Sequence, residues 1–128
     1  MATFTYDHIH LRSPDVEATA QWYANVFGAE IIRTMQQGQP RIDLKLGGCN
    51  IFIAPVAASE GVHGEPDHPH QGLDHFGLLV SGIDAIVTEM KGKGVAFTKE
   101  PTTVRPGVRI AFLTAPQNVS IELLDRSV

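Results

Sequence analysis

The segment HIHLRSPDVEA at residues 8–18 is the key to the fold, because its pattern returns as HFGLLVSGIDA at residues 75–85. In each copy a histidine opens a short apolar run of the kind that forms a strand, and a turn then leads into a helical pattern. The similarity continues downstream, where Gly28 comes near Gly94 and PRIDLKL comes near GVRIAFL. The chain therefore contains an internal repeat with an offset of about 67 residues.

Both halves are expected to contain one strand, then a helix, then three further strands. In the first half the helix begins near residue 13 and stops at Gly28, and strands are expected at residues 6–12, 30–34, 41–46 and 50–54. In the second half the helix covers residues 82–93, and strands are expected at residues 75–80, 95–99, 108–114 and 120–124. Ser13 or Asp15 can cap the first helix, whose core face should consist of Val16, Ala20, Tyr23 and Phe27.

This order of elements predicts an α+β fold of two βαβββ modules. Each module buries one sheet face under one helix and is too small to be stable alone, so pairing of the two sheets is the physical way to close the core. We expect paired curved mixed sheets around a cleft. The chain is then a single domain over residues 1–128, with modules at about residues 4–55 and 74–126 and a linker at residues 56–73.

The composition is that of an ordinary globular domain, with 43% hydrophobic and 19% charged residues among 128. The formal net charge of −4 and the absence of any basic run argue against nucleic-acid and anionic-membrane partners. The one cysteine, Cys49, excludes an internal disulfide, and the N-terminus lacks the pattern of a secretory signal. We therefore expect a soluble, cytoplasmic protein that binds no nucleic acid and no membrane.

Three side chains in the repeat form a candidate metal site. His8 and His75 occupy equivalent places, each preceded by an aspartate, and Glu122 lies in VSIELLD on the face opposite Ile121 and Leu123. A carboxylate in such an apolar strand is costly to bury without a partner, and a nearby cation would remove that cost. Two imidazoles and one carboxylate leave coordination positions open for water or substrate. The sequence thus predicts a divalent-metal site formed by His8, His75 and Glu122.

Other polar side chains near these positions have two interpretations each. His10 shares a strand face with His8, so it is either the group that transfers a proton or an uncharged wall of the cleft. Asp43 interrupts an apolar run and faces either the cleft or the solvent. Cys49 lies beside turn glycines and is expected to be a small buried side chain rather than a nucleophile.

The segment between the two halves contains three histidines, His63, His68 and His70. Tracts rich in histidine can bind metal, but these residues lack the spacing that a helix or strand would impose. We expect them to be exposed loop residues, which could form a lid over the cleft because mobility concentrates in such connections.

Together these features resemble the vicinal oxygen chelate superfamily, which includes glyoxalase I, methylmalonyl-CoA epimerase, extradiol dioxygenases, and fosfomycin and bleomycin resistance proteins. The resemblance rests on the repeat, on DHIHLRSPD, on WYANVFG at the end of the first helix and on the terminal IELL, and it covers essentially the whole chain. It implies a glyoxalase-like fold and places the metal ligands of the family on His8, His75 and Glu122.

The resemblance also implies a departure from the four-ligand members. Those members carry Glu or Gln in the last strand of the first half, and by the spacing to IFIAP that position falls on Ile51, which cannot bind a metal. The remaining set of two histidines and one carboxylate is also that of non-haem iron oxygenases, although the additional His and Tyr motifs of extradiol dioxygenases are not recognisable. Arg109 is placed like an arginine near the substrate of epimerase-like relatives, either as an anion partner or as half of a salt bridge.

The sequence therefore predicts a metal-dependent enzyme that acts on a small oxygen-chelating substrate by lyase, isomerase or extradiol-type dioxygenase chemistry. The metal is one of Fe, Mn, Ni, Co or Zn, because His and Glu ligands serve all of them. The alternative is a metal-free protein that sequesters a drug or another small molecule, like the bleomycin resistance relatives. We expect a homodimer, because two-module relatives associate through their sheets or helices.

Overall fold

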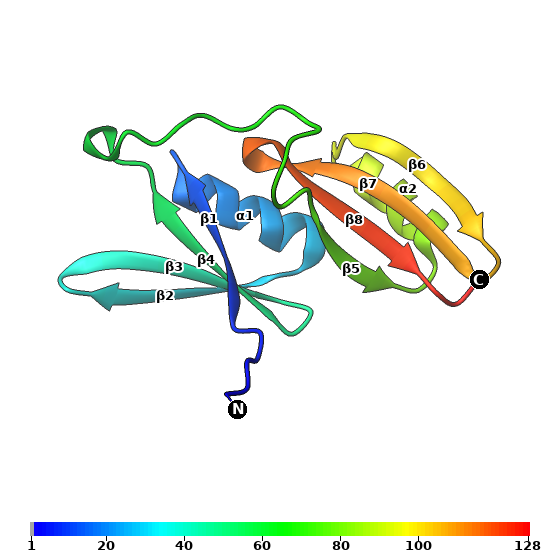
Figure 1. Cartoon of the computed structure of the whole chain (residues 1–128), viewed down its shortest axis with the longest axis horizontal. Coiled ribbons are helices and arrows are strands. Elements are labelled where there is room, and N and C mark those ends of the chain that lie inside the picture. Colours follow the sequence, from blue (N-terminus) through cyan, green and yellow to red (C-terminus); the bar gives the residue numbers. More distant parts are fainter. Residues whose placement is uncertain (1) are drawn as a thin grey trace. The chain divides into compact units, whose positions relative to one another are not determined.

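The computed structural model describes residues 2–128, and the chain divides into two compact units. The first unit ends at His63 and the second comprises Gly64–Val128, so the boundary falls inside the segment predicted as a linker. Each unit consists of a four-stranded mixed sheet with one helix packed against it (Figure 1). The α+β class and the βαβββ order expected from the repeat are confirmed in both units.

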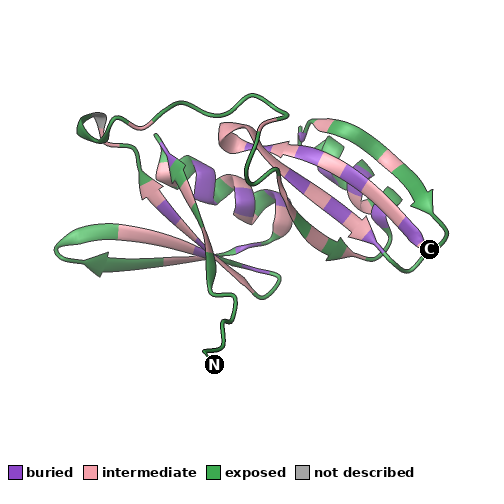
Figure 2. Cartoon of the chain, viewed as in Figure 1, coloured by how far each residue is buried: buried purple, intermediate pink, exposed green. Residues whose placement is uncertain are grey.

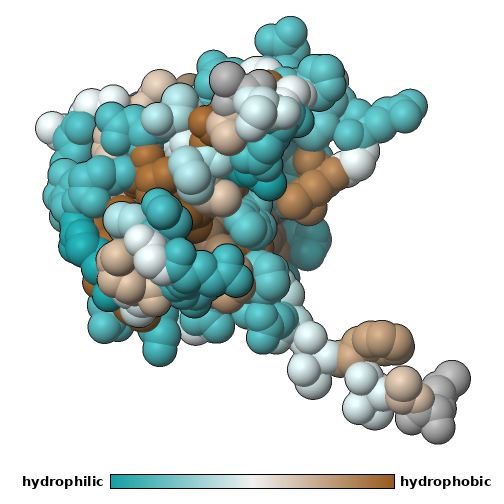
Figure 3. Space-filling model, turned by 90° about the vertical axis from the view of Figure 1, so that its left-hand side faces the viewer, coloured by the Kyte–Doolittle hydropathy of each residue, from teal (hydrophilic) through white to brown (hydrophobic). Residues whose placement is uncertain are grey.

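Unit 1 has the strand order β1-β4-β3-β2, in which β1 runs parallel to β4 and the other neighbours are antiparallel. Its elements are β1 (His8–Ser13), α1 (Val16–Phe27), β2 (Glu30–Gln36), β3 (Gln39–Leu46), β4 (Cys49–Pro55) and the short 3₁₀ helix η1 (Ala58–Glu60). The first strand begins at His8 rather than at the expected Tyr6, because the pairing with β4 starts at His8 and Asn50. The segment of residues 2–7 projects from unit 1 (Figure 3), and Phe4 in it is 93% exposed, whereas Tyr6 and Asp7 contact Cys49 and Asn50 of β4.

Unit 2 repeats this arrangement with the order β5-β8-β7-β6, and β5 runs parallel to β8. Its elements are β5 (Phe76–Val80), α2 (Ile83–Gly92), β6 (Phe97–Arg105), β7 (Val108–Ala115), the 3₁₀ helix η2 (Pro116–Asn118) and β8 (Val119–Asp125). The strand β6 is longer than the predicted 95–99, and it lies at the edge of the sheet with register shifts against β7.

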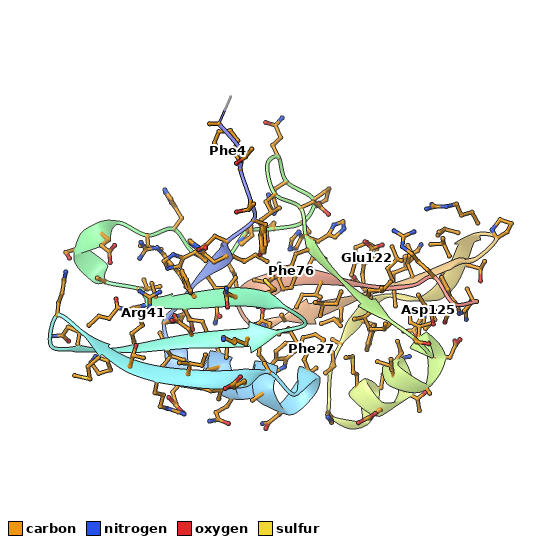
Figure 4. The ribbon with its side chains drawn as sticks, turned by 90° about the horizontal axis from the view of Figure 1, so that it is seen from below. Phe4, Phe27, Arg41, Phe76, Glu122 and Asp125 are labelled. Carbon is orange, nitrogen blue, oxygen red and sulfur yellow. The ribbon has the colours of Figure 1, made fainter. Side chains whose placement is uncertain are left out.

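The two helices begin in different ways. The Asp15 carboxylate accepts a hydrogen bond from the Ala18 N–H (3.0 Å), so one of the two caps expected from the sequence holds the start of α1. In α2 the capping position is Gly82, and the carboxylate of Asp125 in β8 accepts the N–H groups of Gly82 (2.8 Å) and Ile83 (3.1 Å) (Figure 4). Hydrogen bonds from Ser127 and from these backbone groups lower the pKa of the buried Asp125 to about 2.

The core of each unit lies between its helix and its sheet. Buried and half-buried residues alternate along β7 and β8 (Figure 2), since successive side chains point to opposite faces of a strand. On α1, Ala20 and Tyr23 are fully buried as expected, whereas Val16 and Phe27 are only half-buried because they lie at the two ends of the helix. Burial raises the pKa of Tyr23, and within residues 2–128 its hydroxyl has no hydrogen-bond partner.

We call the sheet face that is turned away from the helix the open face of each unit. In β4 the buried Ile51 and Ile53 face α1, so Phe52 between them lies on the open face. In β8 the buried Ile121 and Leu123 face α2 in the same way. The half-buried side chains of the open faces are the ones that a ligand can reach.

Candidate metal centre

His75 and Glu122 form a close pair on the open face of unit 2. Glu122 sits at the middle of β8, and His75 directly precedes β5, the strand that runs parallel to β8. The Nε2 atom of His75 lies 3.2 Å from Oε1 of Glu122. Two ligands that bind one cation at about 2.0–2.2 Å lie about 3 Å apart when the bond angle is near 90°. The observed separation therefore fits a shared divalent cation as well as a direct hydrogen bond.

The other ring nitrogen of His75 is held by its neighbour. Nδ1 lies 2.7 Å from Oδ2 of Asp74, an arrangement in which Nδ1 carries the proton and Nε2 is directed towards Glu122. The hydrogen bond to Asp74 raises the pKa of His75 above its ordinary value, the contact with Glu122 acts in the same direction, and partial burial opposes both. The same hydrogen bond lowers the pKa of Asp74. Asp74 thus orients the imidazole in the way that carboxylates support histidine ligands of metals.

The surroundings of the pair are partly apolar. The ring of Phe112 in β7 stands edge-on to that of His75, with the centroids 4.9 Å apart. Across the pair, Gly77 is the residue of β5 opposite Glu122, and a Cβ there would lie 3.7 Å from Oε1. The absence of a longer side chain at this position keeps the Glu122 carboxylate accessible, with 18% of its side chain exposed.

A hollow of about 600 Å³ lies within unit 2 and is lined in part by Asp74, the partner of His75, although not by His75 or Glu122. Its lining consists of Asp67, His68, Pro69, Asp74, Thr98, Thr114, Asn118 and Ser120. The loop side of the hollow is attached to η2, because His68 Nε2 lies 2.6 Å from the Asn118 carbonyl oxygen and the Asn118 amide donates to the Pro66 carbonyl (2.8 Å). This volume is within the range of small-molecule sites.

In unit 1, His8 repeats part of this geometry. Its Nδ1 lies 2.7 Å from Oδ2 of Asp7, as His75 does with Asp74, and no described residue forms a hydrogen bond with its Nε2. The His8 ring stacks on Phe52 with a centroid distance of 4.1 Å and an interplanar angle of 25°. In both units an aspartate binds Nδ1 of the histidine and leaves Nε2 available. Of the two histidines, His75 has a carboxylate of its own sheet, that of Glu122, next to Nε2.

The position expected for a fourth ligand was assigned wrongly to Ile51. Ile51 pairs with Ile9 and is fully buried against α1, so it corresponds to Ile121, which pairs with Phe76 in unit 2. The counterpart of Glu122 is Phe52, the next residue of β4. The alternation in IFIAP, with isoleucines on both sides of Phe52, is the sequence signal that would have corrected the assignment.

For Arg109 and Asp43, the structure shows which of the two interpretations holds. Arg109 donates through Nε and Nη2 to the two carboxylate oxygens of Asp84 in α2 (3.0 and 2.8 Å), so the salt-bridge reading is the one observed. Asp43 lies on the open face of unit 1, where it accepts from Nε of Arg41 (3.0 Å). The sequence offered no signal for the importance of Arg41.

His10 and Cys49, on the first and fourth strands of unit 1, also carried expectations from the sequence. His10 lies on the open face of unit 1, where its ring centroid is 6.1 Å from that of His8. Cys49 is half-buried rather than buried, because the segment before β1 covers it only in part, and its Sγ lies 3.0 Å from the Tyr6 hydroxyl. This hydrogen bond is the main cause that raises the pKa of Tyr6 to about 12.

The loop histidines divide into two kinds. His68 contacts η2 as described, and its ring lies 5.1 Å from that of His70. His63 is exposed.

Among the side chains of residues 2–128, no three His, Cys, Asp or Glu residues form a cluster that could hold a metal ion, so His8, His75 and Glu122 are not such a cluster. No helix in the same range is both long enough and apolar enough to cross a membrane.

Comparison with known proteins gives the family. The model of the Glyoxalase/Bleomycin resistance protein/Dioxygenase superfamily matches residues 5–123, nearly the whole chain. The chain belongs to this superfamily. The resemblance drawn from the repeat and from its histidines is thereby confirmed.

The curated relatives of this superfamily protein are lactoylglutathione lyases. It is 25% identical over 124 residues to one from Arabidopsis thaliana, an alignment that covers 93% of this chain and 43% of the relative. It is 23% identical over 152 residues to another from Schizosaccharomyces pombe, with coverages of 99% and 49%. The chain thus spans less than half the length of these relatives.

Solved structures of the superfamily share the fold. A glyoxylase/bleomycin resistance protein/dioxygenase domain from Frankia sp. EAN1pec aligns with a TM-score of 0.74 at 21% identity, covering 96% of this chain and 98% of that one. A glyoxalase family protein from Enterococcus faecalis aligns with a TM-score of 0.74 at 20% identity, with coverages of 94% and 96%.

Proposed function

We propose that this superfamily protein is a divalent-metal-dependent lyase that acts on a small molecule with two adjacent oxygens. The observation that carries the proposal is the His75–Glu122 pair, with Nε2 and Oε1 3.2 Å apart and with Nδ1 held by Asp74. A half-buried imidazole and carboxylate at this separation are suited to a cation. Lyase chemistry is preferred to oxygen-dependent ring opening because the curated relatives are lactoylglutathione lyases.

We propose that His8 is the third ligand. Its Nε2 has no partner among the described residues, and its Nδ1 is oriented by Asp7 as that of His75 is by Asp74. A cation bound to these groups would neutralise negative charge that develops on the oxygens of the substrate. The metal is one of Fe, Mn, Ni, Co or Zn, since two imidazoles and a carboxylate accept all of these ions.

The protein's own side chains then have separate tasks. Asp7 and Asp74 keep the two imidazoles in one tautomer, so that the same nitrogen of each ring is presented. His10 transfers the proton, because its ring stands 6.1 Å from that of His8 and is exposed to a substrate on the open face of unit 1. Phe52 and Phe112 cover one side of each histidine with apolar surface, which reduces access of water to the reacting oxygens.

The test is metal analysis of the purified protein after anaerobic loading with Fe(II), Mn(II), Ni(II), Co(II) or Zn(II). We expect about one metal per chain in the wild type and loss of that metal in the His8→Ala, His75→Ala and Glu122→Ala variants. His63→Ala, which changes an exposed loop histidine, is the matched control and should keep the metal. A wild type that stays metal-free under every loading would remove the proposal and favour a protein that sequesters a small molecule.

We also propose that the protein forms a homodimer. Light scattering coupled to size-exclusion chromatography should give twice the chain mass of 13.9 kDa. A mixture of His8→Ala and Glu122→Ala chains tests whether ligands from two chains share one site. Such a mixture regains metal after subunit exchange only if each site draws on both chains.

A further inference from the structure

The open face of unit 1 contains a second group of polar side chains that the proposed metal set does not use. Arg41 is at its centre, on β3 (Figure 4), and it lines a hollow of about 320 Å³. The side chains of this hollow that matter here are His10, Gln36, Gln39, Arg41, Asp43 and Phe52. The volume is near the lower end of small-molecule sites and admits a group of several heavy atoms.

Arg41 is held rigidly on three sides. Its Nε donates to both oxygens of Asp43 (3.0 and 3.1 Å), and its Nη1 donates to the Gln36 side-chain oxygen (2.9 Å). Its guanidinium carbon lies 4.5 Å above the centre of the Phe52 ring, a cation–π contact. Because these contacts fix the planar fork before any ligand arrives, little side-chain entropy remains to be lost on binding.

One end of the same guanidinium is unused. No described residue forms a hydrogen bond with Nη2 of Arg41, and 31% of the side chain is exposed. Arginine donates from five N–H groups and prefers planar oxyanions, which it contacts through two parallel hydrogen bonds. Asp43 offsets the charge of Arg41, so an anion here would be held mainly by the unused N–H groups of Nη2, and Asp43 would repel a single carboxylate less than a more highly charged group.

This arrangement is specific to unit 1. In unit 1, Asp43 of β3 pairs with Phe52 of β4, and Arg41 lies two residues before Asp43. In unit 2, Phe112 of β7 pairs with Glu122 of β8, and Ile110 lies two residues before Phe112. Ile110 is therefore the counterpart of Arg41. The repeat therefore carries a fixed cation in one sheet and apolar side chains at the same places in the other. A guanidinium that only supported the βαβββ fold would not need this exposed position.

We propose that Arg41 and the hollow beside it bind a carboxylate of the substrate, so that the substrate is a small oxygen-chelating acid. The inference rests on the proposed function, because it assigns an additional group to the substrate of that site. His8 stacks on Phe52 at 4.1 Å, and Phe52 lies 4.5 Å below Arg41, so Arg41 is at most two stacking distances from the His8 ring. The carboxylate would thus bind on the same sheet face as the His8 ring.

The experiment is a titration of the metal-free, ¹⁵N-labelled full chain with benzoate, followed by NMR at the Arg41 Nε–H and the His10 ring. We expect saturable shifts at both positions, and none with benzamide, the neutral molecule of the same shape. Arg41→Met should weaken benzoate binding by about tenfold because it removes the charge-assisted hydrogen bonds. Gln36→Leu, which keeps the charge but frees one end of the guanidinium, should weaken it by about threefold.

Arg33→Met is the matched control, since Arg33 is an exposed arginine of unit 1 that pairs with Glu17. This variant should bind benzoate as the wild type does. Equal binding of benzoate and benzamide, no saturation, or unchanged binding in both the Arg41 and the Gln36 variants would overturn the proposal. Because the titration contains no metal, benzoate binding without metal binding refutes only the metal-dependent function, and the reverse result refutes only the carboxylate site.

Discussion

The two units have the same fold and opposite chemistry on their open faces. In unit 2 the histidine lies beside a carboxylate, Glu122, while the neighbouring strand contributes Phe112. In unit 1 the histidine lies on an aromatic ring, Phe52, while the neighbouring strand contributes Asp43. Acidic and aromatic residues have thus exchanged strands between the halves of the repeat.

The faces that contact the helices differ much less. Ile51 and Ile121 occupy the same place and are both fully buried, and Tyr23 and Met90 are both buried at equivalent turns of their helices. Close packing constrains volume and polarity at such positions, whereas an exposed face of a sheet tolerates any side chain that remains partly hydrated. The buried residues of the repeat therefore maintain the fold, and the exposed residues of the open faces are free to differ in function.

The largest effect is expected when the acidic residue of unit 2 is replaced by its aromatic counterpart from unit 1. Glu122→Phe copies unit 1 into unit 2 and removes a proposed ligand, so we expect metal affinity to fall by more than about 100-fold, beyond the loss typical of supporting residues. Competition against a fluorescent chelator measures the affinity. Phe4→Leu is the control, because Phe4 is 93% exposed and lies outside the sheet, and it should leave the affinity unchanged. Equal losses in both variants would show that general disruption, not ligation, is responsible.

The two Asp–His pairs should matter almost as much. Asp74→Ala frees Nδ1 of His75, and Asp7→Ala frees Nδ1 of His8, so each should lower metal affinity by about 10–100-fold. Asp74→Asn keeps an acceptor oxygen and should retain more of the affinity than Asp74→Ala. The same competition assay applies. If neither alanine variant differs from the wild type, the paired aspartates do not support metal ligands.

The starts of the two helices differ in how much they depend on one carboxylate. Asp125→Ala removes the buried group that caps α2 and should lower Tm by more than about 5 °C. Asp15→Ala removes one exposed cap of α1 and should cost only about 1 kcal/mol of unfolding free energy. Thermal and denaturant unfolding of both variants at neutral pH measure the difference.

The pH dependence of the Asp125 effect has a definite sign. The pKa of Asp125 is about 2 in the folded chain, below the value of roughly 3.9 for an unfolded aspartate. Its stabilisation is therefore complete above about pH 5 and is lost as the pH falls through 4 towards 2. The gap in stability between wild type and Asp125→Ala should close over this window. A gap that stays constant down to pH 2 would contradict the lowered pKa.

The smallest expected effect concerns the equivalent core positions Tyr23 and Met90. Tyr23→Phe removes a buried hydroxyl that has no partner among the described residues, so it should raise the unfolding free energy by up to about 1 kcal/mol. Met90→Leu, a volume-conserving change in unit 2, should instead cost less than about 1.5 kcal/mol. Urea unfolding measures both. Destabilisation by Tyr23→Phe would mean that the hydroxyl is hydrogen-bonded in solution.

Much of the fold was predictable because apolar periodicity is a local property. The first helix was expected to stop at Gly28, and Gly28 ends α1 with a φ of 73°, a conformation that glycine adopts without strain. The strand expected at residues 95–99 is shorter than β6, which ends at Arg105. The exposed residues Thr98 to Glu100, and Pro101 after them, interrupt the apolar pattern of this edge strand. Edge strands bury little, so their sequences carry a weak signal.

By itself the sequence determined the repeat, the α+β class and the equivalence of His8 and His75, since all three follow from spacing along the chain. The side chains that meet across strands, and the residues that share a face of a sheet, became known from the three-dimensional structure. It moved the counterpart of Glu122 from Ile51 to Phe52, paired Arg109 with Asp84, and fixed Arg41 against Asp43. Such contacts depend on strand register and on helix placement, which residues distant in sequence set together.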